Sequence, residues 1–290
     1  MLNAITVDVE DYYHVAAFES VVRCECWNQY ESRVVRNTDR ILDIFDTYKT
    51  KATFFVLGHV AERHPALVRT IHSRGHEIAS HGYSHRRIYA QTPQQFREET
   101  RRARKFVEDL IGQSIIGYRA ASYSIVRESL WALDILAEEG FRYDSSIFPI
   151  RHDNYGIPDH TRFFSHFNLN GSDPIAEIPL STIRLMGVNL PVAGGGYLRI
   201  LPYWVTKLAL LHLNRYEQQP AVVYFHPWEI DPDQPRIHGG FKSRFRHYTN
   251  LRGMERKVHR LLSSFSFAPI REVYAARLNM PAATLDSDAA

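Results

Sequence analysis

The chain has 290 residues, enough for one large α/β domain or two small ones. Hydrophobic residues make up 44% and charged residues 23%, as in ordinary globular proteins, and the formal net charge is +3. Lysine and arginine are spread along the chain rather than gathered in one tract, so nucleic-acid binding is not indicated. The two cysteines, Cys24 and Cys26, are too close in sequence to form a disulfide framework.

Residues 4–9 predict a β-strand whose end is acidic. Neither a basic segment nor a long apolar segment precedes it, so we expect no export signal and a cytoplasmic location. Asp8 and Glu10 would point to one side of the strand and Asp11 to the other. Carboxylates buried together are costly unless a cation or a shared proton relieves them, so the pattern indicates either a functional cluster or an exposed acidic turn.

Helical and strand patterns then alternate along the chain with short connections. We predict helices at residues 34–48, 65–74, 92–111 and 129–139, and strands at residues 52–57, 77–79 and 115–118. This alternation is typical of βαβ units that build a parallel sheet. The run is too long for a small open sheet, so we expect a barrel-like closure with the active groups at the carboxyl ends of the strands.

The predicted strand at residues 77–79 is followed by His81 and His85. A spacing of four places both imidazoles on one side of a helical turn or tight loop. Two histidines and one carboxylate are a common ligand set for catalytic zinc and similar divalent ions. Two ordinary histidines, solvated or satisfied in the core, are the alternative.

The second half of the chain is less regular. The glycine run at residues 194–196 lacks the lysine and helix cap of a phosphate loop and favours flexible close packing. No apolar stretch is long enough to span a bilayer. Residues after about 279 are expected to be frayed. We predict helices at residues 204–214 and 253–264, a buried strand at residues 220–225 and a closing strand at residues 267–273.

Polar groups follow several predicted strands where a fold would need only turns. They are Asp8, Glu10 and Asp11, then His81 and His85, then Arg119, Asp144 and His226. In a parallel barrel these strand ends meet at one mouth. Two histidines and a carboxylate can hold a metal there, leaving a second carboxylate, a cation and a third histidine for chemistry. The combination indicates metal-assisted hydrolysis of an acyl group.

The order of these motifs resembles the polysaccharide deacetylase family, the nodulation-protein B homology domain. The resemblance covers residues 5–227, and the segments VDVEDYYHV, GYRAASYSI and YDSSIFP resemble a subgroup associated with exopolysaccharide and protein-sorting loci. It implies a distorted, mostly parallel (β/α) barrel. It also implies one domain over residues 1–278, with residues 194–278 as a subgroup-specific segment packed on it, and a disordered tail at residues 279–290.

The resemblance implies a metal site and a base. His81 and His85 match the two histidine ligands, and Asp8 matches the general base. The family commonly has two adjacent acids, whereas Val9 intervenes here. The third ligand is therefore Glu10, which shares a face with Asp8, or Asp11, which is the more usual ligand type. Zinc is the expected metal, with cobalt, nickel or iron as alternatives.

Further matches concern the groups around the base and the leaving amine. Arg119 matches the arginine that orients the base, although Ala121 replaces the family's proline. His226 matches the general acid and Asp144 the acid that tunes it. Backbone N–H groups at Ser122 and Tyr123 are candidate oxyanion donors.

The resemblance implies removal of N-acetyl groups from an N-acetylated polysaccharide, oligosaccharide or glycan precursor. Tyr12, Tyr123 and Trp228 are candidates for stacking on sugar rings, although packing in the core or at its rim is the more common role for any one such ring. Hydrolysis of a small amide or cyclic imide is one alternative, and a non-catalytic glycan-binding protein on the same fold is another. The sequence indicates neither the sugar nor an oligomeric state.

Overall fold

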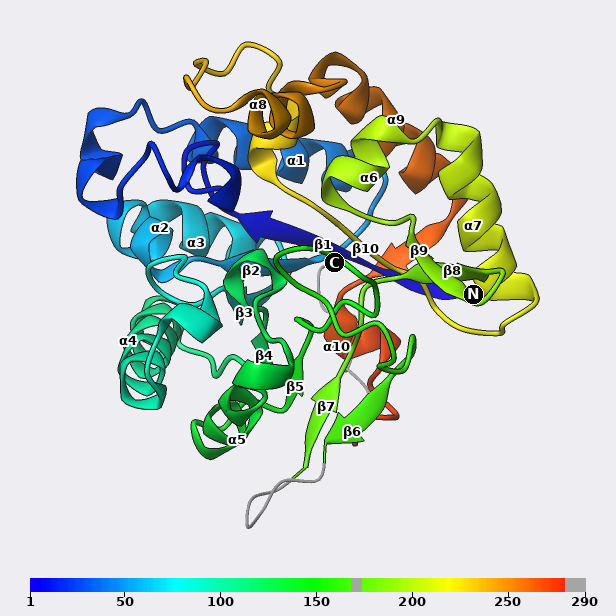
Figure 1. The fold of residues 1–290 in the computed structure, drawn as a ribbon, viewed down its shortest axis with the longest axis horizontal. Helices are drawn as coiled ribbons and strands as arrows, with labels where there is room; N and C mark the ends of the chain where they lie inside the picture. The colour runs from blue at the N-terminus through cyan, green and yellow to red at the C-terminus, as the bar shows by residue number, and fades with distance from the viewer. Residues whose placement is uncertain (168–173, 280–290) are drawn as a thin grey trace, which may run out of the picture.

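The computed structural model describes residues 1–167 and 174–279. A sheet of mostly parallel strands runs through it, and the helices lie around this sheet (Figure 1). The strand order is β10-β1-β2-β3-β4-β5-β7-β6, with β11 paired to β1. Only the pairing of β6 with β7 is antiparallel in this sheet. Along the described strands the order does not return from β6 to β10, so the barrel is half closed.

Nine strands form this sheet, and a separate hairpin adds two more. The sheet strands are β1 (Leu2–Val9), β2 (Thr53–Val56), β3 (Glu77–Ser80), β4 (Gly117–Tyr118), β5 (Tyr143–Asp144), β6 (Ser165–Phe167), β7 (Ile175–Glu177), β10 (Val222–Phe225) and β11 (Ser266–Ala268). The hairpin consists of β8 (Thr182–Leu185) and β9 (Val188–Pro191). Strands β2, β3 and β10 are buried at every position, as expected for a parallel sheet covered on both faces.

The helices cover the sheet and connect its strands. They are α1 (Val34–Thr47), α2 (Gly58–Arg63), α3 (Pro65–Ser73), α4 (Pro93–Ile111), α5 (Trp131–Glu138), α6 (Gly195–Ile200), α7 (Tyr203–Arg215), α8 (Phe241–Tyr248), α9 (Leu251–Ser264) and α10 (Ile270–Val273). The long helix α4 is delimited by its sequence: Thr92 and Gln95 form a capping box, and Gly112 ends the helix with φ +66°. Among the described residues, no helix is both long and apolar enough to cross a membrane.

The α/β class and the parallel strands agree with the sequence prediction, but three details differ. The predicted strand at residues 267–273 stops at Ala268, because Pro269 has no N–H for the sheet and instead precedes α10. The glycine run begins helix α6; a Cβ on Gly194 would lie 1.8 Å from the Tyr224 ring, so close packing is present there. The irregular region contains the β8–β9 hairpin, whose turn residues Met186 and Gly187 both have positive φ. The predicted tail lies outside the described residues, apart from Asn279.

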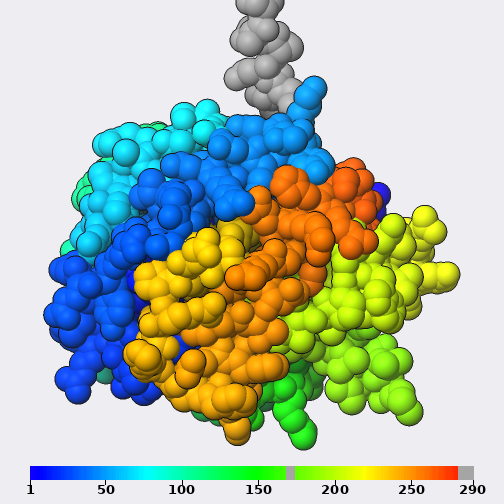
Figure 2. Space-filling view, turned by 90° about the horizontal axis from the view of Figure 1, so that it is seen from above, coloured from blue at the N-terminus to red at the C-terminus, as the bar shows by residue number. Residues whose placement is uncertain are grey.

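Segments distant in sequence meet on one face of the molecule. Figure 2 shows residues 225–265, in yellow to orange, packed between the N-terminal segments in blue and α7 in yellow-green. The short helix η6 (Pro227–Ile230) lies against both α1 and α9. The C-terminal half therefore packs directly beside the end of β1, where the acidic residues lie.

Candidate active site

The carboxyl ends of β1, β3, β4 and β10 are adjacent because these strands are parallel neighbours in the sheet. They place Asp8, His81, Arg119 and His226 at one edge, as the sequence predicted for a parallel barrel. A cavity of about 860 Å³ opens at this edge, and its lining includes Asp8, Glu10, His81, His85, Tyr123 and His226.

Glu10, His81 and His85 form the one group of metal-ligand type found among the described residues. One ligand atom from each of them lies within 4.8 Å of the other two. Nε2 of His85 is 2.7 Å from Oε2 of Glu10. Nδ1 of His81 is 2.9 Å from the carbonyl oxygen of Arg119, which can only accept, so Nδ1 carries the proton and Nε2 keeps its lone pair.

The protonation of this group suits a divalent cation. Burial lowers the pKa of His81 to about 4, which leaves a neutral imidazole. Burial alone would raise the pKa of Glu10, but His85 and His226 lower it below the usual range, so the carboxylate is ionised. Two imidazoles and one carboxylate are a ligand set that fits zinc and related ions.

Asp11 is not part of this group. Its oxygens accept hydrogen bonds from Ser32 Oγ at 2.7 Å, Arg33 N at 3.0 Å and Val34 N at 3.3 Å. These donors lie at the N-terminus of α1, so Asp11 caps that helix from the neighbouring segment. The two carboxylates diverge as strand alternation predicts, and of the two alternatives Glu10 is the one beside the histidines.

Asp8 is held by two donors at the centre of the site. Nη1 of Arg119 is 2.7 Å from Oδ1, and the Tyr123 hydroxyl donates to Oδ2 at 3.2 Å. Arg119 is fully buried and also donates to Thr6 Oγ1 at 2.7 Å and to Ser145 O at 3.0 Å. The guanidinium therefore fixes the orientation of the Asp8 carboxylate.

His226 faces the two acidic residues at the end of β1. Its Nε2 is 3.5 Å from Glu10 Oε1 and 3.9 Å from Asp8 Oδ2. Its Nδ1 is 3.0 Å from Oε2 of Glu229. Burial alone would lower the pKa of His226, but Glu10, Glu229 and Asp8 raise it to about 9. The imidazole is therefore charged at neutral pH and can donate a proton from Nε2 into the cavity.

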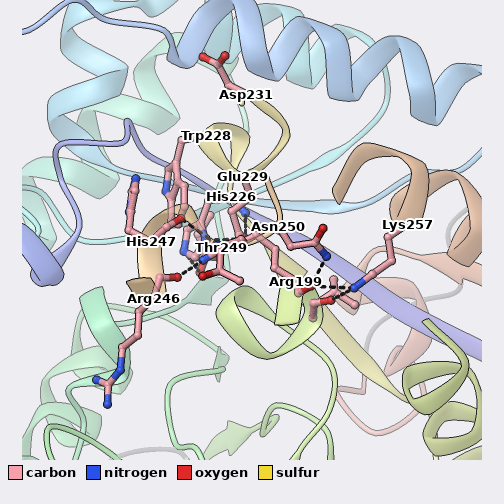
Figure 3. Close-up of polar contacts among 12 residues, drawn as sticks. Arg199, His226, Trp228, Glu229, Asp231, Arg246, His247, Thr249, Asn250 and Lys257 are labelled. Atoms are coloured by element: carbon pink, nitrogen blue, oxygen red, sulfur yellow. Dashed lines mark hydrogen bonds and ion pairs between the residues drawn. The ribbon is translucent and has the colours of Figure 1, made fainter. Parts of the chain in front are cut away.

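Two residues that the sequence analysis missed complete this arrangement. Nε of the buried Arg199 is 2.5 Å from Oε1 of Glu229, so the carboxylate lies between Arg199 and His226 (Figure 3). Burial alone would raise the pKa of Glu229, but Arg199 and His226 lower it to about 2. The segment HPWE contains a usable signal, because an acid three residues after a histidine can bond both its backbone and its ring.

Asp144 does not have the role that the resemblance implies. It accepts from Ser146 Oγ at 2.6 Å and from Ser146 N at 3.2 Å, and its closest acidic neighbour is Glu177. It is the last residue of β5, which is separated from β10 in the sheet, and the carboxylate beside Nδ1 of His226 is that of Glu229. This segment supports the site through Ser145, whose Oγ and carbonyl oxygen accept from Arg119.

The candidate substrate-binding residues differ in position. Tyr123, Ser122 and Trp228 line the cavity, whereas Tyr12 is buried in the neighbouring apolar cluster and does not. Trp228 is stacked between His226 and His247, with ring centroids 5.1 and 4.1 Å away, and its Nε1 donates to Glu10. Both indole faces are thus covered, so Trp228 supports the site rather than stacking on a sugar.

The proposed oxyanion donors are only partly available. The Tyr123 N–H donates to Ala120 O at 3.1 Å, so it is used within its own loop. Ser122 and Tyr123 both have positive φ, near +55°, an uncommon conformation for residues with side chains. This loop directs the Tyr123 side chain toward Asp8.

Two family models match consecutive parts of the chain. A model described as polysaccharide deacetylase matches residues 27–143, and a domain of unknown function, DUF3473, matches residues 145–275. The first includes His81, His85 and Arg119, and the second includes His226, Glu229 and Arg199. Asp8 and Glu10 precede both matched ranges.

Curated relatives resemble a limited part of the chain. A peptidoglycan deacetylase of Helicobacter pylori is 32% identical over 108 residues, which are 37% of this chain and 36% of the relative. A chitooligosaccharide deacetylase of a Bradyrhizobium species is 29% identical over 100 residues, or 34% of this chain and 43% of the relative. The chain thus spans about a third to two fifths of the length of these relatives.

Solved structures share the fold over nearly the whole chain. A Mycobacterium smegmatis structure described as a polysaccharide deacetylase superposes with a TM-score of 0.61 at 19% identity, covering 99% of this chain and 94% of the other. The allantoinase Puue superposes with a TM-score of 0.58 at 17% identity, covering 95% and 88%. At these identities the similarity extends to the fold, which is the distorted (β/α) barrel that the sequence predicted.

Proposed function

We propose that this chain is a metal-dependent hydrolase of the polysaccharide deacetylase family and that it removes N-acetyl groups from a glycan. One observation carries the proposal: Asp8, the group of Glu10, His81 and His85, and His226 surround the same end of one cavity. The curated deacetylases support the reaction type, and the cavity of about 860 Å³ supports a substrate larger than a small amide.

Glu10, His81 and His85 would hold a divalent ion, which we propose to be zinc. Such an ion polarises an acetyl carbonyl and makes a water molecule more acidic. Asp8 is placed to take the proton of the attacking water, because Arg119 and Tyr123 each hold one of its carboxylate oxygens.

His226 is placed on the other side of Glu10 to complete the reaction. Attack on the carbonyl carbon is followed by cleavage of the carbon–nitrogen bond, and the departing amine needs a proton. Nε2 of His226 supplies it, while Glu229 on Nδ1 stabilises the charged ring beforehand. The products are acetate and a free amino sugar. We also propose that this reaction takes part in exopolysaccharide synthesis.

Metal content measured together with acetate release tests this proposal. Purified protein and the His81→Ala variant are analysed for bound metal, and both are incubated with N-acetylglucosamine oligomers and with small amides. We expect about one metal per chain and acetate from the oligomers with the unmodified protein, and the loss of both in the variant. Absence of metal from the unmodified protein after zinc addition would contradict the catalytic proposal. Turnover of small amides alone would contradict the glycan substrate.

A further inference from the structure

Helix α8 adds positive charge to the wall of the active-site cavity. Lys242 and Arg246 both line the cavity and both are exposed. They are four residues apart, so they lie on the same face of the helix. Arg244, on the same helix, is also exposed but does not line the cavity.

This charge is not neutralised by other residues of the cavity. Three carboxylates line the cavity, and each has another role or partner. Asp8 is the proposed base, Glu10 is part of the metal group, and Glu19 pairs with Arg87 at 2.6 Å. Within the described residues, neither Lys242 nor Arg246 forms an ion pair. Exposed cations without partners at the edge of a concave site attract and orient anionic groups.

The backbone that carries these side chains is fixed to the catalytic groups. Arg199 donates to the carbonyl oxygens of Arg246 at 2.8 Å, His247 at 2.9 Å and Thr249 at 2.7 Å, while its Nε holds Glu229. Figure 3 shows the Arg246 side chain directed away from this cluster, although its carbonyl oxygen faces Arg199. Arg199 thus positions both the end of α8 and Glu229, the carboxylate that holds His226.

Aromatic side chains beside this wall suit a sugar. Tyr197 and His152 line the cavity and are half-buried, and the His152 ring is stacked on Tyr155 with centroids 3.8 Å apart. The Tyr197 and His152 rings offer apolar surfaces to a sugar, while the cations of α8 offer a place for charge.

We propose that the substrate is an N-acetylated glycan that carries an anionic group, a carboxylate or a phosphate, and that Lys242 and Arg246 bind this group. The inference rests on the proposed function, since it concerns the same cavity. A carboxylate would come from a uronic acid within the glycan, and a phosphate from a phosphorylated glycan precursor. The shared chemistry is a negative charge on the same glycan as the acetylated amine.

The test compares three oligosaccharides of equal length as substrates of the full chain loaded with zinc. One contains only N-acetylglucosamine, one alternates N-acetylglucosamine with glucuronate, and one carries a phosphate at its reducing end. We expect a higher kcat/KM for one or both anionic oligosaccharides, and the preferred one identifies the source of the charge. In the Lys242→Glu/Arg246→Glu variant, we expect KM for that substrate to rise about tenfold more than KM for the neutral one.

Arg244→Glu is the matched control, because it alters charge on the same helix outside the cavity; its kinetics should equal those of the unmodified protein. Equal kcat/KM for neutral and anionic oligosaccharides, or equal effects of the cavity and control variants, would overturn the inference and leave the deacetylase proposal intact. If no oligosaccharide releases acetate, calorimetric binding decides instead. Anionic oligosaccharides that bind the unmodified protein more tightly than the double variant support the inference, and equal binding overturns it.

Discussion

Nδ1 of His226 lies 3.0 Å from Oε2 of Glu229, and the opposite oxygen of that carboxylate lies on Arg199. The carboxylate is fully buried, so its charge acts on the imidazole without screening by solvent. Glu229 fixes the ring so that Nε2 points toward the end of β1. The orientation of His226 therefore depends on Glu229, which is only three residues away in sequence. Glu229 is in turn held by Arg199 from helix α6.

Replacement of Glu229 by glutamine should slow the hydrolysis of amides more than that of activated esters. The substitution keeps the shape but removes the charge that favours protonated His226, and a positioned general acid typically contributes 10²- to 10⁴-fold. We expect kcat for N-acetylglucosamine oligomers to fall about 100-fold. Hydrolysis of 4-nitrophenyl acetate, whose leaving group needs no proton, should fall less than about fivefold.

The control for this experiment is Glu255→Gln, which alters a carboxylate that pairs with Arg40 at the surface. It should leave both rates unchanged. If Glu229→Gln lowers the rates of amide and ester hydrolysis equally, Glu229 stabilises the fold rather than the protonated form of His226.

Glu10→Gln and Asp11→Asn should have opposite effects on metal content and stability. Glu10→Gln removes the anionic ligand beside His81 and His85, so we expect the bound metal to be lost. Asp11→Asn weakens the cap on α1, so we expect metal retention and a loss of about 1–2 kcal/mol in the free energy of unfolding. Elemental analysis and urea unfolding of both variants distinguish the two roles, and metal loss in Asp11→Asn would contradict them.

Replacement of Arg119 by alanine should strongly destabilise the protein. It would leave the Asp8 carboxylate buried without its partner, and removal of one member of a buried ion pair typically costs about 3–5 kcal/mol. Arg119→Ala combined with Asp8→Asn should recover part of this loss, because no charge then remains unpaired. Urea unfolding of the two single variants and the double variant measures the coupling, and additive effects would contradict it.

Glu177→Gln should make stability less dependent on pH. Burial and the neighbouring Asp144 raise the pKa of Glu177 well above 4.5, and burial raises the pKa of Asp144 to about 6. The folded protein thus binds protons that the unfolded chain has released, so stability falls as pH rises from about 4 to above 6. Thermal unfolding across this range should show a smaller decline in Glu177→Gln than in the unmodified protein. An identical decline in both proteins would contradict proton binding by Glu177 in the folded state.

The sequence predicted the parts of the site that depend on local spacing or on strand ends. His81 and His85 are recognisable from their separation, and Asp8, Arg119 and His226 from their positions at or just after the ends of buried strands. Strand alternation placed Glu10 on the side of Asp8, but aspartate is the more usual ligand type, which is why Glu10 and Asp11 remained alternatives. Arg199 could not be found, because its partners come from η6 and from the end of α8.

Some predictions about the fold were wrong for similar reasons. Helix α6 begins within a glycine run, and its conformation depends on packing against the Tyr224 ring rather than on helix propensity. The assignment of Asp144 failed because its neighbour Glu177 and the intervening strands separate it from His226. In both cases the deciding contacts join residues far apart in the chain.

The groups that would bind metal and accept a proton lie before residue 120, whereas His226, Glu229 and Arg199 lie in the region matched by DUF3473. Neither region carries a complete reaction centre. Under the proposed function, a fragment that contains only one of the two regions would therefore lack either the metal ligands or the proton donor.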